Sequence, residues 1–195
     1  MTTLSIYIAG AWIEQHQRAR PMLARVREAG LVVTQDWTQP EGDVCSCGCP
    51  KGVHYGAERD FDGYFGICKT CGPQKCSRFN GIGVGSDSRL TAEQRYMHAL
   101  ACLKGVLAAD VVWLLSANSQ GSSGAWVELG AALTARRMRE ERIAEGCGPT
   151  IGVHAVPVIV VSGAKWNRTI FTELVDAHFE TDEAALAHVL ALRNR

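Results

Sequence analysis

The chain has no excess of charge of either sign and no long hydrophobic run. Its 195 residues carry 20 lysines and arginines against 20 aspartates and glutamates, so no global charge attracts it to nucleic acid or to an anionic membrane. No apolar run approaches the roughly 20 residues that a membrane-spanning helix needs, so no membrane partner is expected. Residues 1–5 lack the basic and apolar regions of a signal peptide, and we expect a cytoplasmic protein.

The length and the alternation of segments predict one α/β domain over residues 1–195. This length suffices for one sizeable core and is too short for two ordinary domains. Strand-like segments (4–9, 31–35, 110–115, 155–161 and 177–180) alternate with helix-like segments (15–29, about 91–107, 124–144 and 182–192). This pattern favours a mainly parallel sheet covered on both faces, most economically a flavodoxin-like doubly wound sheet. Its ligand crevice would lie between the carboxyl ends of the first and third strands.

Several helices carry signals of how they face and where they stop. In the first helix Met22, Leu23 and Val26 are candidates to face inward, and Gly30 is the expected stop. The second helix has an apolar stripe at helical spacing, formed by Met97, Leu100, Leu103 and Leu107. The closing helix is expected to begin near Thr181.

Six of the eight cysteines lie in a glycine-rich stretch, residues 40–86, that has no sustained helical or strand period. We expect this stretch to be a small cysteine-rich insertion. Cys68 and Cys71 are spaced like half of a tetrahedral zinc site, and the other two ligands would come from a wider set. That set consists of Cys45, Cys47, Cys49, Cys76 and His54. The stretch has little aliphatic content, so a structural Zn²⁺ is expected as a staple; disulfides are disfavoured without a secretion signal.

The role of this insertion is open between a lid over the crevice and an oligomer contact. Between residues 40 and 86 five basic residues are balanced by five acidic ones. Such a balance is a poor electrostatic footprint for nucleic acid, which is therefore not an expected partner.

The third strand opens into a polar loop of small residues, 116–124, after which a helix begins. Open α/β sheets commonly bind ligands at such a strand–loop–helix unit, and the helix N-terminus offers free N–H groups to an anion. Glu128 lies close to the start of this helix, either as a partner of the helix dipole or as a reagent. The loop at 9–12 is predicted to meet the loop at 116–124 in the crevice.

Three segments together resemble the nucleoside 2-deoxyribosyltransferase superfamily, which includes deoxynucleotide N-glycosidases. They are residues 6–12, 109–112 and 124–130, and their order and spacing match the family. The resemblance covers nearly the whole chain except the insertion. It implies that Glu128 attacks the anomeric carbon of a deoxynucleoside or its monophosphate and displaces the base. The resulting glycosyl-enzyme ester would pass the sugar to another base or to water.

The resemblance also implies roles for other residues. Tyr7 matches a tyrosine near the nucleophile that holds the carboxylate, with a buried core tyrosine as the alternative. Asp110 matches an aspartate that touches the sugar or base, with a strand-start turn residue as the alternative. Further candidate substrate contacts are Gly10, Trp12, Asp36, Asn118, Ser122, Ser123 and Gly124. The last three can bind a 5′-phosphate or form a simple turn.

One position departs from the family pattern. Eight residues before Asp110 the family usually carries an aspartate that helps to protonate the departing base, and this chain has Cys102 there. His98, one helical turn earlier, is the candidate to take over the acid role, against the alternative of a surface or core histidine. The alternative function is a non-catalytic nucleotide-sensing module on the same fold. The resemblance further implies a homo-oligomer, because family members often complete their sites across a subunit interface.

Overall fold

The computed structural model describes residues 4–11, 15–38, 92–116, 123–146, 156–164 and 169–193. The chain divides into two units, one formed by residues 1–38 and 101–195 and the other by residues 39–100. The predicted insertion at 40–86, with its six cysteines and His54, lies outside the described residues. Of the second unit the structure describes residues 92–100, which form the first part of helix α2 (Ala92–Ala108).

The described part of the first unit is built on a sheet of five strands. They are β1 (Ser5–Ala9), β2 (Val32–Val33), β3 (Val111–Leu115), β4 (Val158–Ser162) and β5 (Ala177–Phe179), in the order β2-β1-β3-β4-β5. Every pair is parallel, and Ile6 of β1 faces Val33 on one side and Val111 on the other. The predicted α/β class is confirmed. The order is that of a doubly wound sheet whose direction reverses between β1 and β3.

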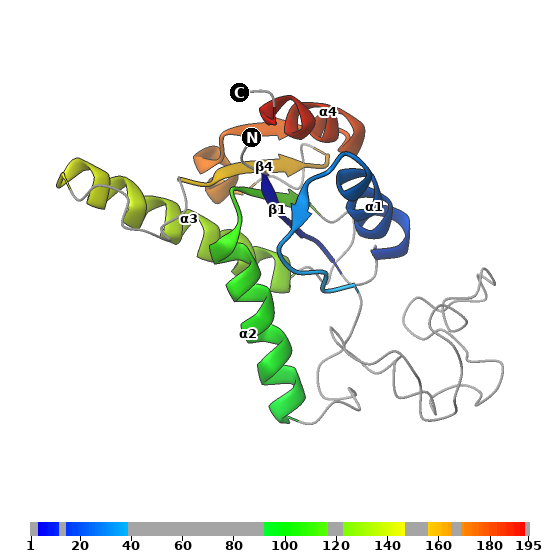
Figure 1. Ribbon diagram of the computed structural model, residues 1–195, viewed down its shortest axis with the longest axis horizontal. Helices are drawn as coiled ribbons and strands as arrows, with labels where there is room; N and C mark the ends of the chain where they lie inside the picture. Colours follow the sequence, from blue (N-terminus) through cyan, green and yellow to red (C-terminus); the bar gives the residue numbers. More distant parts are fainter. Residues whose placement is uncertain are drawn as a thin grey trace. The chain divides into compact units, whose positions relative to one another are not determined.

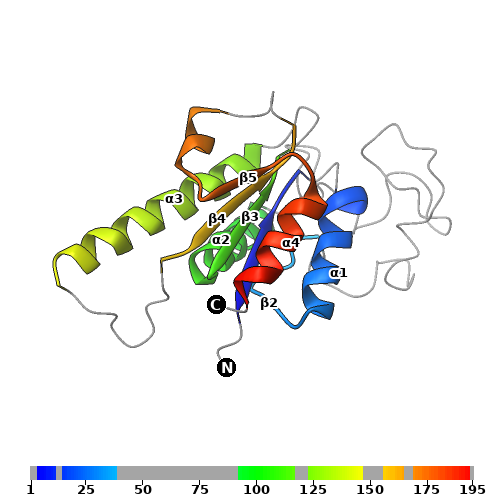
Figure 2. The ribbon, with the colours of Figure 1, turned by 90° about the horizontal axis from the view of Figure 1, so that it is seen from above.

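Helices lie on both faces of this sheet. Figures 1 and 2 show α1 (Arg20–Glu28) and α4 (Asp182–Leu192) on one face, and α3 (Ser123–Ala144) with residues 101–108 of α2 on the other. A π-helical turn (Gln15–Ala19) precedes α1, and a 3₁₀ helix (Ile170–Leu174) follows β4. Among the described residues no helix is both long and apolar enough to cross a bilayer.

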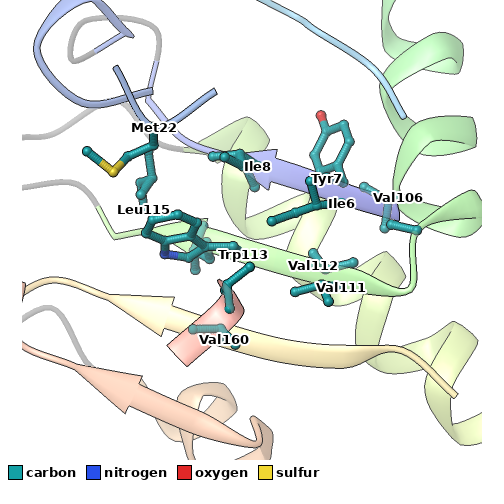
Figure 3. Close-up of a cluster of buried hydrophobic side chains, with 14 of the residues drawn as sticks. Ile6, Tyr7, Ile8, Met22, Val106, Val111, Val112, Trp113, Leu115 and Val160 are labelled. Atoms are coloured by element: carbon teal, nitrogen blue, oxygen red, sulfur yellow. The ribbon is translucent and has the colours of Figure 1, made fainter. Parts of the chain in front are cut away.

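The core lies along β1 and β3, which are apolar runs because both of their faces are covered. Trp113 is the largest fully buried side chain among the described residues, and its Nε1 donates a hydrogen bond to Ser162 Oγ at 2.9 Å. Figure 3 shows the buried apolar side chains gathered along β1 and β3, with the Tyr7 hydroxyl pointing away from β1. Tyr7 thereby lies on the side of the sheet where Val106 of α2 packs.

The helix signals in the sequence are confirmed at several positions. Met22, Leu23 and Val26 are buried, and Gly30 has a φ of 81° directly after α1. Thr181 caps α4 by accepting a hydrogen bond from the Ala184 N–H at 3.2 Å.

Helix α2 differs from the apolar stripe that its sequence suggests. Leu107 is 46% exposed, whereas Cys102 and Val106 are buried. Gly105 lies between these two small side chains and is buried too. The face of α2 that meets the sheet is therefore built from small residues, which allow a close approach to β1.

Candidate active site

Two side chains that are 121 residues apart in the sequence meet on the sheet face that α3 covers. The Tyr7 Oη donates a hydrogen bond to Glu128 Oε1 at 2.7 Å. Tyr7 lies in the middle of β1 and is completely buried, whereas Glu128 is partly exposed. The pair thus joins the core of the sheet to a partly exposed residue of α3.

This pair lies over the face of the sheet and not at its carboxyl edge, where the sequence placed the crevice. Because β3 and β4 are parallel, α3 must run back along the sheet from that edge. Glu128 is five residues beyond the start of α3, which at 1.5 Å per residue is about 7.5 Å along the helix. The first turn of α3 contains no acidic residue, and the helix dipole acts mainly within that turn. The dipole is therefore not the main partner of Glu128.

Burial dominates the electrostatics of Glu128. Loss of water raises the pKa of this carboxyl to about 7, while the hydrogen bond from Tyr7 lowers it. Burial and the neighbouring Glu128 charge raise the pKa of Tyr7 far above its ordinary value, so the phenol stays protonated and remains a donor. The site therefore combines a dehydrated carboxylate, which changes charge near neutral pH, with a fixed neutral donor. Dehydrated carboxylates of this kind serve as nucleophiles or bases.

Cys102 lies beside the same pair. Its thiol is buried, and this burial raises the pKa of Cys102 to about 11. The hydrogen bond with the Tyr7 hydroxyl lowers the pKa, but by less than burial raises it. The charge of Glu128 raises the Cys102 pKa further. A thiol with such a pKa stays protonated at neutral pH and is a poor general acid. The residue at the position where the family resemblance implies an acid is thus close to the carboxylate, but it is chemically weak in that role.

Two predicted site carboxylates have partners that hold the fold together. Asp110 Oδ2 accepts hydrogen bonds from the Ser5 N–H at 2.8 Å and the Ser5 hydroxyl at 2.6 Å, which ties the amino ends of β1 and β3. Asp36 Oδ1 accepts from the Thr38 N–H and hydroxyl at 3.1 and 2.6 Å. Its Oδ2 accepts from Arg27 Nη2 at 2.7 Å. Their contacts with substrate remain predictions.

The predicted glycine and serine contacts that the structure describes lie in two segments, the end of β1 and the start of α3. Gly10 directly follows β1, and a Cβ there would lie 3.4 Å from Trp37 Cζ2 and 3.5 Å from Leu115 Cβ. Ser123 and Gly124 are exposed at the start of α3, and among the described residues no atom outside the backbone of that helix lies within 4 Å of the place where a Gly124 Cβ would be. The helix start is therefore accessible, as anion binding requires.

Several predicted site residues cannot be located relative to Glu128. Trp12, Asn118 and Ser122 lie outside the described residues. His98 is partly buried on α2, in the second unit, so its acid role stays a prediction. Within the described ranges no group of three or more His, Cys, Asp or Glu side chains is arranged to hold a metal ion. The predicted zinc ligands Cys45, Cys47, Cys49, Cys68, Cys71 and Cys76 are outside those ranges.

A second polar cluster, which sequence reasoning missed, lies at the carboxyl edge of the sheet. Arg18, from the π-helical turn, donates from Nε and Nη2 to the two carboxylate oxygens of Asp182, each at 2.8 Å. Its Nη1 donates to the Ser116 carbonyl at 2.6 Å, and the Ser162 hydroxyl donates to Asp182 Oδ1 at 2.5 Å. Burial opposes ionisation of Asp182, but the Arg18 and Ser162 hydrogen bonds bring its pKa below the ordinary value. The cluster joins α4, the π-helical turn and the ends of β3 and β4.

Sequence reasoning also missed Gly105. A glycine inside a helical pattern is a signal for close packing, because it lowers helix stability unless something requires the space. Here Gln35 Cβ and the ring of Tyr7 occupy that space.

No protein-family model, curated protein or solved structure matches the chain.

Proposed function

We propose that the chain is an enzyme that cleaves the N-glycosidic bond of a deoxynucleoside or deoxynucleoside monophosphate through Glu128. The observation that carries this proposal is the 2.7 Å hydrogen bond from Tyr7 Oη to Glu128 Oε1. These are the two residues to which the family resemblance assigns the nucleophile and the group that holds it. The parallel α/β sheet supports the same family, because its order gives a doubly wound fold.

The proposed chemistry uses the second carboxylate oxygen of Glu128 as the nucleophile. While Tyr7 holds Oε1, the other oxygen forms a bond to the anomeric carbon, and the electron pair of the C–N bond leaves with the base. Negative charge at Glu128 stabilises the oxocarbenium-like transition state, and a fixed donor keeps the carboxylate oriented. Water or a second base then attacks the anomeric carbon of the ester and gives up a proton, which replaces the one that His98 donated, and Glu128 leaves as a carboxylate. His98 is the proposed source of the proton for the departing base.

The finer architecture belongs to the same proposal. We place a flavodoxin-like domain over residues 1–195, with a cysteine-rich insertion at 40–86 held by a structural Zn²⁺. The ligands would be drawn from the six cysteines of that segment and His54. A cytoplasmic homo-oligomer is part of this proposal, since members of the family that the chain resembles often complete their sites across a subunit interface.

The test is release of free base from a panel of deoxynucleosides and their 5′-monophosphates. We expect at least one substrate to yield base with wild-type protein and none with Glu128→Ala. Adding a second free base distinguishes exchange from hydrolysis. Nucleotide binding by the wild-type protein without release or exchange would contradict the enzyme and favour the sensing module.

A further inference from the structure

Gly105 lies inside α2, directly against the ring of Tyr7. A Cβ at this position would lie 2.9 Å from Tyr7 Cδ2 and 3.1 Å from Tyr7 Cε2. It would also lie 2.6 Å from Gln35 Cβ. Neither neighbour is the end of a flexible chain: an aromatic ring is rigid, and Gln35 Cβ is bonded to the backbone. Helix α2 therefore reaches Tyr7 at this distance because residue 105 has no side chain.

The backbone of Gly105 is also fastened to the sheet. Thr34, directly after β2, donates from Oγ1 to the Gly105 carbonyl at 2.8 Å and to the Ile6 carbonyl at 3.3 Å. Its own N–H donates to the Ile6 carbonyl at 3.0 Å. Ile6 precedes Tyr7 on β1, so one threonine holds the helix and the strand together beside the ring.

We infer that Gly105 is a positioning residue. Its backbone, which is hydrogen-bonded to Thr34 and carries no side chain, fixes the position of the Tyr7 ring. The position of the ring in turn determines whether the Tyr7 hydroxyl can bind Glu128. An added methyl group must retreat to the 3.4 Å of an ordinary contact, by about half an ångström from Tyr7 Cδ2 and by about 0.8 Å from Gln35 Cβ, so the ring, the Gln35 segment or the helix has to move. The Tyr7–Glu128 bond at 2.7 Å tolerates little such movement before it weakens. The effect on turnover rests on the proposed function, but the effect on the Tyr7–Glu128 contact does not.

The test is the titration of Glu128, monitored by NMR on protein with labelled glutamate carboxyl groups. The Glu128 signal is assigned by its absence from the spectrum of Glu128→Gln. In Gly105→Ala we expect the pKa of Glu128 to rise by roughly one pH unit, because a weaker donor stabilises the carboxylate less. The matched control is Gly130→Ala on α3, where no atom of the described residues, apart from the backbone of that helix, lies within 4 Å of the Cβ position. It should leave the titration unchanged. An unchanged titration in folded Gly105→Ala would overturn the inference.

A double substitution separates positioning from general damage to the fold. In the Tyr7→Phe background, which has no hydroxyl to misplace, Gly105→Ala should not raise the Glu128 pKa further. An equal rise with and without the Tyr7 hydroxyl would also overturn the inference, because the effect would then not pass through Tyr7. Gly105→Ala should also slow base release when the Tyr7 hydroxyl is present, and should not slow it further in the Tyr7→Phe background. If no substrate releases base, the titration still decides the positioning role, so the two failures are distinguishable.

Thr34 supplies a second route to the same test should Gly105→Ala fail to fold. Thr34→Val removes the donor with little change in volume, whereas Thr34→Ser keeps the hydroxyl. We expect Thr34→Val to raise the Glu128 pKa and Thr34→Ser to preserve it. Equal titrations in Thr34→Val and Thr34→Ser would contradict the proposed fastening.

Discussion

Replacing Glu128 with glutamine should make the protein more stable at alkaline pH. Burial raises the Glu128 pKa from 4.5 to about 7, so the native state binds this proton more tightly than the unfolded chain does. The protonated Glu128 therefore contributes to the free energy of unfolding below pH 4.5, and this contribution is lost as the pH rises through about 7 and the native state gives up the proton. At 1.36 kcal/mol per pKa unit, this shift corresponds to a loss of about 3 kcal/mol in the free energy of unfolding. We expect a loss of about 2 kcal/mol, because solvent screens the partly exposed Glu128.

Urea unfolding of wild type and Glu128→Gln at about pH 5 and about pH 8.5 measures this difference. Glutamine has the same shape, carries no charge and keeps an oxygen that can accept from Tyr7. The two proteins should be almost equally stable at the lower pH, and the variant should gain about 2 kcal/mol at the higher pH, with an unchanged urea dependence. Glu141→Gln on the exposed side of α3 is the control, and it should change stability by less than about 0.5 kcal/mol at either pH. Equal stability of wild type and Glu128→Gln at alkaline pH would refute the desolvation of Glu128.

Three further perturbations test other parts of the structure. Tyr7→Phe removes the hydroxyl donor but keeps the ring, so the pKa of Glu128 should rise above 7. The ascending limb of the pH–rate profile should then move to higher pH. An unshifted limb would mean that the Tyr7 hydroxyl does not stabilise the Glu128 carboxylate. Asp182→Asn removes the carboxylate that pairs with the part-buried Arg18 and should cost about 2 to 4 kcal/mol in the free energy of unfolding. In wild type the stability from the lowered Asp182 pKa is present above 3.8 and is lost as the pH falls below that value, which thermal unfolding at acid pH should reveal. A chelator under reducing conditions should release zinc from residues 40–86 and make that segment sensitive to proteases. Protein that is purified without bound zinc would contradict the proposed structural zinc site.

The order of helices and strands was predictable because its signals are local. Gly30 and Thr181 mark helix ends through backbone conformation and capping, which depend on a few neighbouring residues. The second strand is shorter than the predicted 31–35, since the structure has Val32–Val33. Thr34 leaves the strand pattern with its hydroxyl bonded to Gly105, 71 residues away, and no local pattern reports such a partner.

The candidate site was predictable only in its residue identities. The family resemblance named Tyr7 and Glu128, and the structure brings them into contact. The loss of water at Glu128, which raises its pKa, depends on how tightly α2 and α3 pack on β1. The neighbours Cys102 and Gly105 belong to a helix that the sequence separates from β1 by about 90 residues, so their convergence on Tyr7 is a property of the packed fold.

The pairing of Arg18 with Asp182 has a consequence for the order in which the chain can be completed during synthesis. These residues are 164 positions apart, so Arg18 emerges from the ribosome long before its counter-charge exists. Until Asp182 is made, the guanidinium that binds the Ser116 and Ser162 carbonyls lacks its two-pronged contact with this carboxylate, so burying it there is less favourable. The carboxyl edge of the sheet therefore closes late, after α4 has been translated, and a nascent chain stalled before residue 182 would expose that edge to chaperones and proteases.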